Sequence, residues 1–255
     1  MARARVIAAG ETNVGMKRSH NEDNFLINEE LNLYVVADGM GGHNGGEYAS
    51  AICVNTVEEI VENMELGDAV PVEEDDPVDL VREKLRYALR LSGRRIYEKA
   101  AESPEFHGMG TTAVALLIDA GNAFVAHVGD SRLYLVREDT VQQVTEDHSF
   151  VARQVKAGAL TEEQAKSHRM RNVIYRSLGY QEDVEVDVQV LALRKGDRFL
   201  LCSDGLSGHL EEFEIFDHLK NHAPQEASRR MIDLACERGG DDNITVVVAL
   251  VDEVP

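Results

Sequence analysis

The stretch LYVVADGMGGHNGG, residues 33–46, decides how this chain folds and where its chemistry lies. It begins as an apolar run typical of a buried strand, stops at Asp38 and continues into a glycine-rich turn. A carboxylate at the end of a strand is held rigidly, and Gly39 and Gly41 allow the backbone to approach a bound ion closely. The pattern therefore predicts a strand that delivers an acidic group to a site.

The same design occurs twice more along the chain. Residues 198–208, RFLLCSDGLSG, form an apolar run that ends at Asp204. A further acid, Asp242, stands just before the apolar run 243–251. Asp-Gly and Asp-Asn pairs are also common in ordinary turns. Several acids that each bound a buried strand nevertheless indicate carboxylates that converge at one edge of a domain.

Composition disfavours several classes of function. The 255 residues include 46 acidic and 26 basic side chains, which give a formal net charge of -20. Such a surface disfavours binding to nucleic acid and to anionic membranes, which both attract positive charge. The three cysteines lie far apart without a CxxC motif, so neither a disulfide framework nor a zinc site is expected. Without a signal peptide or an apolar run long enough to span a membrane, the sequence indicates a cytoplasmic protein.

The spacing of apolar residues predicts two antiparallel sheets and two pairs of helices. Strands are expected over residues 6–12, 25–28, 31–37, 113–118, 122–128, 132–137, 140–144, 184–190, 198–203 and 243–251. Helices are expected over residues 46–64, 78–101, 211–220 and 225–237. The fold class is therefore α+β, as a four-layer α-β-β-α sandwich with a helix pair on each outer face. We expect residues 1–255 to form a single domain.

Three segments are expected to connect these elements. The acidic segment 65–79 is interpreted as a solvent-exposed loop between the first two helices, and residues 108–112 as a turn. Residues 148–178 change character and contain a basic and polar run that includes Ser167 and His168. Because an insert of this length between sheet strands is typical of a lid, we expect it to form a mobile flap.

Acidic residues at the predicted turns also indicate a metal site. They are Glu22, Asp23, Asp38, Asp130, Asp204 and Asp242. If these side chains meet, they cannot all stay ionised without cations. Ligation by oxygen alone favours Mg²⁺ or Mn²⁺ over zinc, since no cysteine cluster or histidine pair accompanies the acids.

Seven short motifs follow one another in order along the chain. They are Arg18-x-x-Asn21-Glu22-Asp23, Val36-Ala37-Asp38-Gly39-Met40-Gly41-Gly42, Gly110-Thr111-Thr112, Gly129-Asp130-Ser131-Arg132, Asp147-His148-Ser149, Ser203-Asp204-Gly205 and Asp242-Asn243-Ile244-Thr245. This ordered set, which covers essentially the whole chain, resembles that of the metal-dependent type 2C protein serine/threonine phosphatases, the bacterial members in particular. The resemblance implies the same layered sandwich.

The resemblance also implies which residues bind two Mn²⁺ or Mg²⁺ ions. It makes Asp38 the carboxylate that bridges the two ions. The carbonyl group of Gly39, together with Glu22 through water, would complete the shell of the second ion. Asp204 and Asp242 would bind the first ion.

Other motif residues receive supporting roles from the same resemblance. Asp23 corresponds to an acid that orients metal-bound water, and Arg18 to the arginine that grips the substrate phosphate. Asp130, with Asp204, corresponds to a weaker third metal site. Ser167 and His168 correspond more loosely to flap residues that tune access and the third ion.

The reaction implied by the resemblance is hydrolysis of phosphoserine and phosphothreonine in proteins. A hydroxide that bridges the two ions would attack phosphorus directly, without a phosphoenzyme. The expected partners are phosphorylated proteins, among them a bacterial Ser/Thr kinase and its substrates, and the protein is expected to be a monomer. Many eukaryotic relatives have a histidine directly after the Asp-Gly pair, whereas this chain has Met40, so the donor of the leaving-group proton stays open.

Two other functions fit the same motifs. One is a catalytically inactive module that keeps the fold and binds phosphoproteins. The other is a metal-dependent phosphatase of small phosphoesters, or one that serves a stress-signalling pathway. The inactive module is disfavoured because every expected ligand position of the two-ion centre that needs an acid carries one.

Overall fold

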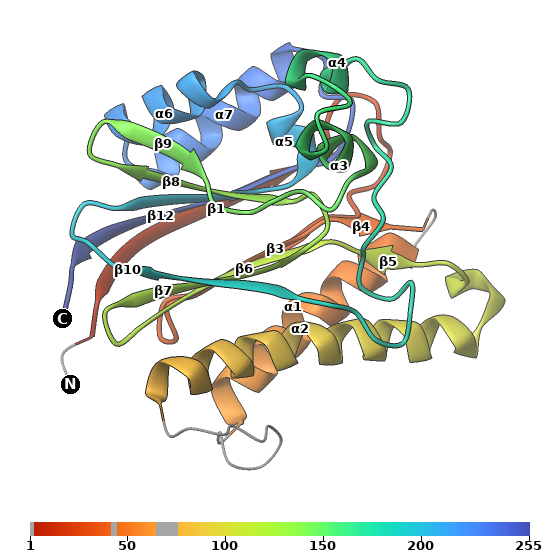
Figure 1. The fold of residues 1–255 in the computed structure, drawn as a ribbon, viewed down its shortest axis with the longest axis horizontal. Helices are drawn as coiled ribbons and strands as arrows, with labels where there is room; N and C mark the ends of the chain where they lie inside the picture. The colour runs from red at the N-terminus through yellow and green to blue at the C-terminus, as the bar shows by residue number, and fades with distance from the viewer. Residues whose placement is uncertain (1–2, 42–44, 65–75) are drawn as a thin grey trace.

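The chain folds around two five-stranded sheets that pack face to face, as the computed structural model shows for residues 3–41, 45–64 and 76–255 (Figure 1). The first sheet has the strand order β1 (Arg5–Asn13), β12 (Ile244–Glu253), β11 (Arg198–Cys202), β8 (Arg132–Arg137) and β9 (Thr140–Gln143). The second has the order β10 (Asp187–Ala192), β7 (Asn122–Val128), β6 (Ala113–Asp119), β3 (Leu33–Ala37) and β2 (Asn24–Asn28). All neighbouring strands in both sheets are antiparallel.

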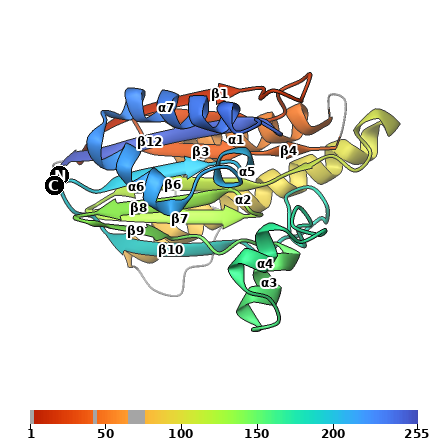
Figure 2. The ribbon, with the colours of Figure 1, turned by 90° about the horizontal axis from the view of Figure 1, so that it is seen from above.

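Helices cover the outer face of each sheet (Figures 1 and 2). The second sheet is covered by α1 (Gly45–Asn63) and α2 (Pro77–Glu102), and the first by α6 (Glu212–Asn221) and α7 (Pro224–Glu237). The shorter helices are α3 (Phe150–Lys156), α4 (Glu162–Lys166), α5 (Asp204–Ser207) and the 3₁₀ turn η1 (Pro104–Phe106). The predicted four-layer α+β sandwich is confirmed.

Strand β3 is apolar at every position because both of its faces are buried. Leu33, Val35 and Ala37 pack against α1 and α2, whereas Tyr34 and Val36 face the other sheet. Successive side chains of a strand point to opposite faces, so a strand covered on both faces needs an apolar residue at every position. Burial of each larger side chain stabilises the fold by roughly 1.5–3 kcal/mol. The packing on both faces leaves Asp38 at a fixed strand end.

Three segments differ from the sequence-based expectations. Residues 108–112 are not only a turn, because β5 (Gly110–Thr111) pairs with the short strand β4 (Gly39–Met40) that follows Asp38. Strand β10 begins three residues later than expected, because its partner β7 pairs with it only from the Asp187–His127 pair onward.

The acidic segment 65–79 is only partly a loop. The Asp76 side chain accepts a hydrogen bond from the Val78 N–H and caps α2, whose first residue is Pro77. Residues 76–79 therefore belong to the start of a helix, while residues 65–75 lie outside the described part of the chain. Within that described part, none of the helices is long and apolar enough to cross a membrane.

Candidate active site

The predicted acids gather at one edge of the sandwich. Asp38 follows β3, and Asp130 lies between β7 and β8. Asp204 follows β11 as the first residue of α5, and Asp242 precedes β12. Because β3 belongs to one sheet and β11 and β12 to the other, the cluster spans the gap between the two sheets.

Asp38 lies at the electrostatic centre of this cluster. Burial is the largest cause of a pKa for Asp38 well above the ordinary range of an aspartate. The negative charges of Asp23, Asp204, Asp130 and Asp242 raise the pKa further. These are four of the predicted site residues, so the structure brings them to one place.

The neighbouring acids show the same pattern. The pKa of Asp23 and that of Asp130 are each raised to about 7, mainly by burial and in part by the negative charge of Asp204. Burial is also the main cause of the raised pKa of Asp204 and of Glu22, and the charge of Asp242 adds to both. A group of carboxylates that resist ionisation together is an arrangement that bound cations stabilise.

Two buried oxygen atoms fit a cation site directly. Among the described residues, Glu22 Oε1 and Asp23 Oδ1 are buried and have no hydrogen-bond partner. An ionised carboxylate can only accept, and such atoms are seldom left unpaired in a folded protein. Hard divalent cations such as Mg²⁺ and Mn²⁺ bind oxygen ligands of this kind, so the donor set fits the metal predicted from the sequence.

Gly39 lies where two backbone segments approach each other closely. A methyl group in place of its hydrogen would be 2.1 Å from the carbonyl oxygen of Gly46 and 2.4 Å from that of Glu22. Both obstacles are backbone atoms, so they cannot turn aside. Only glycine fits here, and it holds the start of α1 against the loop that carries Glu22.

Hydroxyl groups hold the acids in place, and the sequence analysis assigned no role to them. The hydroxyl groups of Ser203 and Thr245 donate to Asp23 Oδ2 at 2.9 Å and 2.6 Å, which leaves Oδ1 directed elsewhere. The Thr111 hydroxyl donates to the Asp38 carbonyl oxygen at 2.9 Å. The sequence position of Ser203 directly before Asp204 and of Thr245 three residues after Asp242 was the available signal for these two.

Asn243 ties the N-terminal loop to the acidic cluster. Its amide nitrogen donates to the carbonyl oxygens of Val14 and His20, and its side-chain oxygen accepts from the Glu22 N–H at 2.8 Å. This loop also carries Arg18, whose guanidinium donates to Asp242 Oδ2 at 2.7 Å. The Arg18 side chain is 51% exposed, so it lies at the mouth of the site.

The two predicted flap residues lie apart from these contacts. Ser167 ends α4 and its hydroxyl donates to the carbonyl oxygen of Gln164. The ring of His168 stacks on Phe150 at 5.7 Å between centroids. Neither residue contacts the acidic cluster in the described part of the chain, so the structure brings together the predicted acids and Arg18 but not Ser167 and His168.

A second group of potential metal ligands lies at the base of the flap. His127, His148 and Asp187 offer ligand atoms within 4.8 Å of one another. The Gly129 N–H donates to His148 Nδ1, so this nitrogen is occupied and cannot bind a metal ion. The Arg176 guanidinium lies 3.0 Å from both His148 Nε2 and Asp187 Oδ1. A cation already fills this cluster, and its role is structural.

His148 instead connects the flap to the loop before Asp130. Its N–H donates to the carbonyl oxygen of Gly129, and its own carbonyl oxygen accepts from the Tyr175 N–H. The Phe150 N–H donates to the carbonyl oxygen of Val173 one step further out. Both ends of the flap are therefore held together at one place. Burial lowers the pKa of His148 to about 4, so its ring is neutral at neutral pH.

The raised pKa values predict how pH affects the chain without metal. An aspartate with a raised folded-state pKa stabilises the fold below its unfolded pKa of about 4, and this stability is lost as pH rises through the folded value. For Asp23 and Asp130 that value is about 7. We expect the melting temperature of the metal-free protein to fall between about pH 4 and pH 7, and added Mn²⁺ to reverse the fall. A metal-free melting temperature that rises over this range would contradict the expectation.

The fold and its acidic cluster are those of a known protein family. The protein phosphatase 2C family matches residues 16–243 of this chain, so the chain belongs to this family. It is 36% identical over 251 residues to the serine/threonine protein phosphatase PstP of Mycobacterium tuberculosis, with 98% of this chain and 46% of PstP covered. It is 35% identical to the protein phosphatase PhpP of Streptococcus pneumoniae, with 95% and 96% covered.

A solved structure shows metal in the same fold. The catalytic domain of PstP in complex with two manganese ions has a TM-score of 0.83 and 33% identity to this chain, with 97% of this chain and 99% of that chain covered. The chain spans about half the length of the mycobacterial relative. These similarities show the family and the fold.

Proposed function

We propose that this protein is a metal-dependent phosphatase that hydrolyses phosphoserine and phosphothreonine in proteins. The observation that carries the proposal is the convergence of acids from both sheets around Asp38, with two buried carboxylate oxygens left unpaired. The PstP structure with two manganese ions supports two Mn²⁺ or Mg²⁺ ions per chain. Asp38 would bridge them, and the Gly39 carbonyl group, Glu22, Asp204 and Asp242 would complete the set of ligands. Asp130 with Asp204 would bind a weaker third ion.

The side chains around the ions would have separate roles in substrate binding and proton transfer. When bound, the ions lower the pKa of a water nucleophile and offset the charge of the phosphoryl group. Arg18, half-exposed beside Asp242, binds phosphoryl oxygens with its planar fork of donors. Asp23 Oδ1 is the atom available to accept a proton from the attacking water, because hydroxyl groups already occupy Oδ2.

We further infer the domain organisation of the protein, its location and its partners. Residues 1–255 form a single phosphatase domain with the flap at about 148–178, and Ser167 and His168 tune access from that flap. The protein acts as a cytoplasmic monomer on phosphorylated proteins and opposes a Ser/Thr kinase. The names of PstP and PhpP support phosphoprotein substrates.

The experiment that tests the function measures phosphate release from a phosphothreonine peptide. The protein is first stripped of metal and then supplied with Mn²⁺ or Mg²⁺. We expect activity to require the ion and to be lost in Asp242→Asn. The matched control is Asp241→Asn, since the neighbouring Asp241 is 53% exposed and pairs with Lys17. Folded protein that is inactive with every divalent ion would instead favour the phosphoprotein-binding module.

The hydroxyl groups on Asp23 give a second prediction. Thr245→Val keeps the shape of a fully buried side chain and removes the donor that lies 2.6 Å from Asp23 Oδ2. A hydrogen bond to a charged group contributes roughly 1.5–3 kcal/mol, so we expect kcat to fall about tenfold to a hundredfold. In the control Thr145→Val the lost hydroxyl accepts from the Leu133 N–H and does not touch an acid. Equal loss of kcat in both variants would refute the role given to Thr245.

A further inference from the structure

A pocket of about 310 Å³ lies at the end of the sandwich opposite the acids. Arg198, which lines it, begins β11, and Asp204 follows the other end of the same strand. Six residues of extended chain span about 20 Å. The loop between β10 and β11 lies at the end of the molecule where both termini are found (Figure 1). A ligand in this pocket would therefore not touch the acidic cluster.

The charge of this pocket is opposite to that of the chain. Five cationic side chains line it, against the two carboxylates of Glu138 and Asp197. The five are Arg137, Arg194, Lys195, Arg198 and Lys220. In the whole sequence acids outnumber cations by 46 to 26, so a random lining would be acidic. We call this site the cationic pocket.

Two of the five cations are already used by the fold. Arg137 forms a bidentate pair with Asp197 at 2.7 Å for both bonds, and Asp197 is 1% exposed. Lys220 donates to Asp139 at 3.1 Å and to the carbonyl oxygen of Glu138. These contacts shape the pocket but leave little charge for a ligand.

Among the described residues, only one of the other three cations has an ion pair, and that pair is long. Within the described residues, Lys195 makes no hydrogen bond or ion pair through its side chain, and the nearest carboxylate to Arg194 is Glu138 at 3.8 Å. Arg198 donates only to carbonyl oxygens, those of Leu219 and His222, and burial lowers its pKa. A partly buried guanidinium without a carboxylate is stabilised by an added anion.

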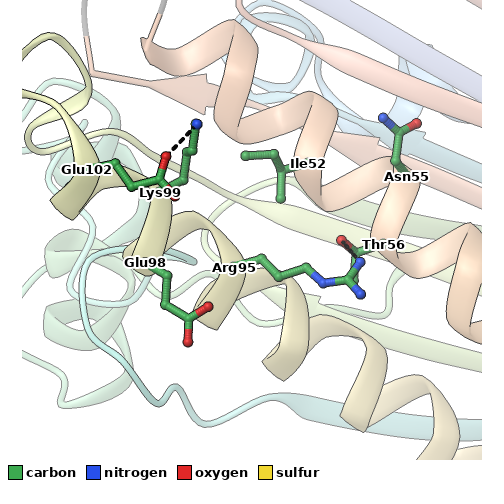
Figure 3. A pocket seen from close by; sticks show the side chains of 7 residues that line it. All are labelled: Ile52, Asn55, Thr56, Arg95, Glu98, Lys99 and Glu102. Carbon is green, nitrogen blue, oxygen red and sulfur yellow. Dashed lines mark hydrogen bonds and ion pairs between the residues drawn. The ribbon is translucent and has the colours of Figure 1, made fainter.

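A second pocket shows that volume alone does not produce such a surplus. It measures about 340 Å³ and lies between α1 and α2 (Figure 3). Its cations are paired, because Arg95 Nη1 lies 2.5 Å from Glu59 and Lys99 Nζ lies 2.6 Å from Glu102. The lining has as many acids as bases, so nothing there selects a charged ligand.

We propose that the cationic pocket binds a small molecule that carries at least two phosphate groups. Arg194, Lys195 and Arg198 offer more positive charge than one phosphate group needs, and arginine forks match phosphate oxygens bidentately. The pocket is large enough for a diphosphate. This binding is separate from phosphatase chemistry, since it uses neither the acids nor the ions.

The test is calorimetric titration of the full chain with pyrophosphate, ADP and inorganic phosphate. The protein is first freed of divalent ions and of chelator, so that the acidic cluster, without its ions, repels anions. We expect saturable binding of pyrophosphate with one site per chain. The double variant Arg194→Ala, Lys195→Ala should bind at least about tenfold more weakly, equivalent to about 1.4 kcal/mol.

The control removes two positive charges of similar exposure that lie outside the cationic pocket. Arg94 and Arg229 have side chains that are 58% and 74% exposed, against 62% for Arg194, so Arg94→Ala, Arg229→Ala matches the loss of charge. Binding should be unchanged in this control. The proposal is overturned by an unaltered isotherm in the pocket variant, by equal weakening in the control, by phosphate binding as tightly as pyrophosphate, or by no saturable binding at millimolar concentrations. ADP that binds as tightly as pyrophosphate or more tightly supports it.

Discussion

Asp38→Asn is expected to lower the rate of phosphate release about a thousandfold while the protein stays folded. The loss corresponds to about 4 kcal/mol of transition-state stabilisation, the scale on which a catalytic metal contributes. Asp38 is the residue whose pKa responds to four other acids of the cluster, so an amide there removes the charge that the two bridged ions would share. Metal affinity and turnover should therefore fall together.

The same variant predicts a change that does not depend on turnover. Without metal, removal of one charge from a group of buried carboxylates relieves repulsion, so metal-free Asp38→Asn should melt above the metal-free wild type at about pH 8. Mn²⁺ should then raise its melting temperature less than that of the wild type. Wild-type activity with unchanged metal demand would show that Asp38 does not bridge the ions.

Gly39→Ala should destabilise the protein and weaken the site at once. The new methyl group would meet the carbonyl oxygens of Gly46 and Glu22 at distances that no rotamer relieves. Overpacking of this kind costs roughly 1–3 kcal/mol, which corresponds to a melting temperature lower by about 2–12 °C. Phosphate release should fall about a hundredfold or more, because the Gly39 carbonyl group and Glu22 would both move from their ligand positions.

A control for Gly39→Ala is available at Gly121. Gly121 has a φ of +80° and no atom within 4 Å of an added methyl group, so Gly121→Ala tests backbone strain without a collision. It should cost about 1 kcal/mol of stability and leave activity unchanged. Similar loss of activity in both variants would mean that close packing at Gly39 does not position the site.

The architecture could be predicted because the burial of each strand is reflected in its pattern of apolar residues. β3 and residues 199–202 of β11 are covered on both faces, so each appears as an uninterrupted apolar run that leads to an acid. Strand ends covered in this way predict both the layers and the place where Asp38 and Asp204 meet. In the structure the acids lie close enough to raise one another's pKa.

Other features depend on contacts that local sequence does not reveal. β5 forms only because Gly110 and Thr111 meet β4 from a distant part of the chain. Asp76 was included in an acidic loop, although its carboxylate caps α2. The side chains that line the cationic pocket come from separate strands and a helix, so no single segment of the sequence predicts it.

The origin of the acids from both sheets has a consequence for the order of assembly. Asp38 follows a strand of one sheet, whereas Asp204 and Asp242 adjoin strands of the other, so neither sheet alone contains a complete site. The ligands come together only once the sheets have docked, and an ion cannot guide the earlier steps of folding. Contacts formed after the transition state slow unfolding rather than speed folding. Bound metal should therefore lengthen the lifetime of the native state, and phosphatase activity should appear only in chains whose two halves have closed.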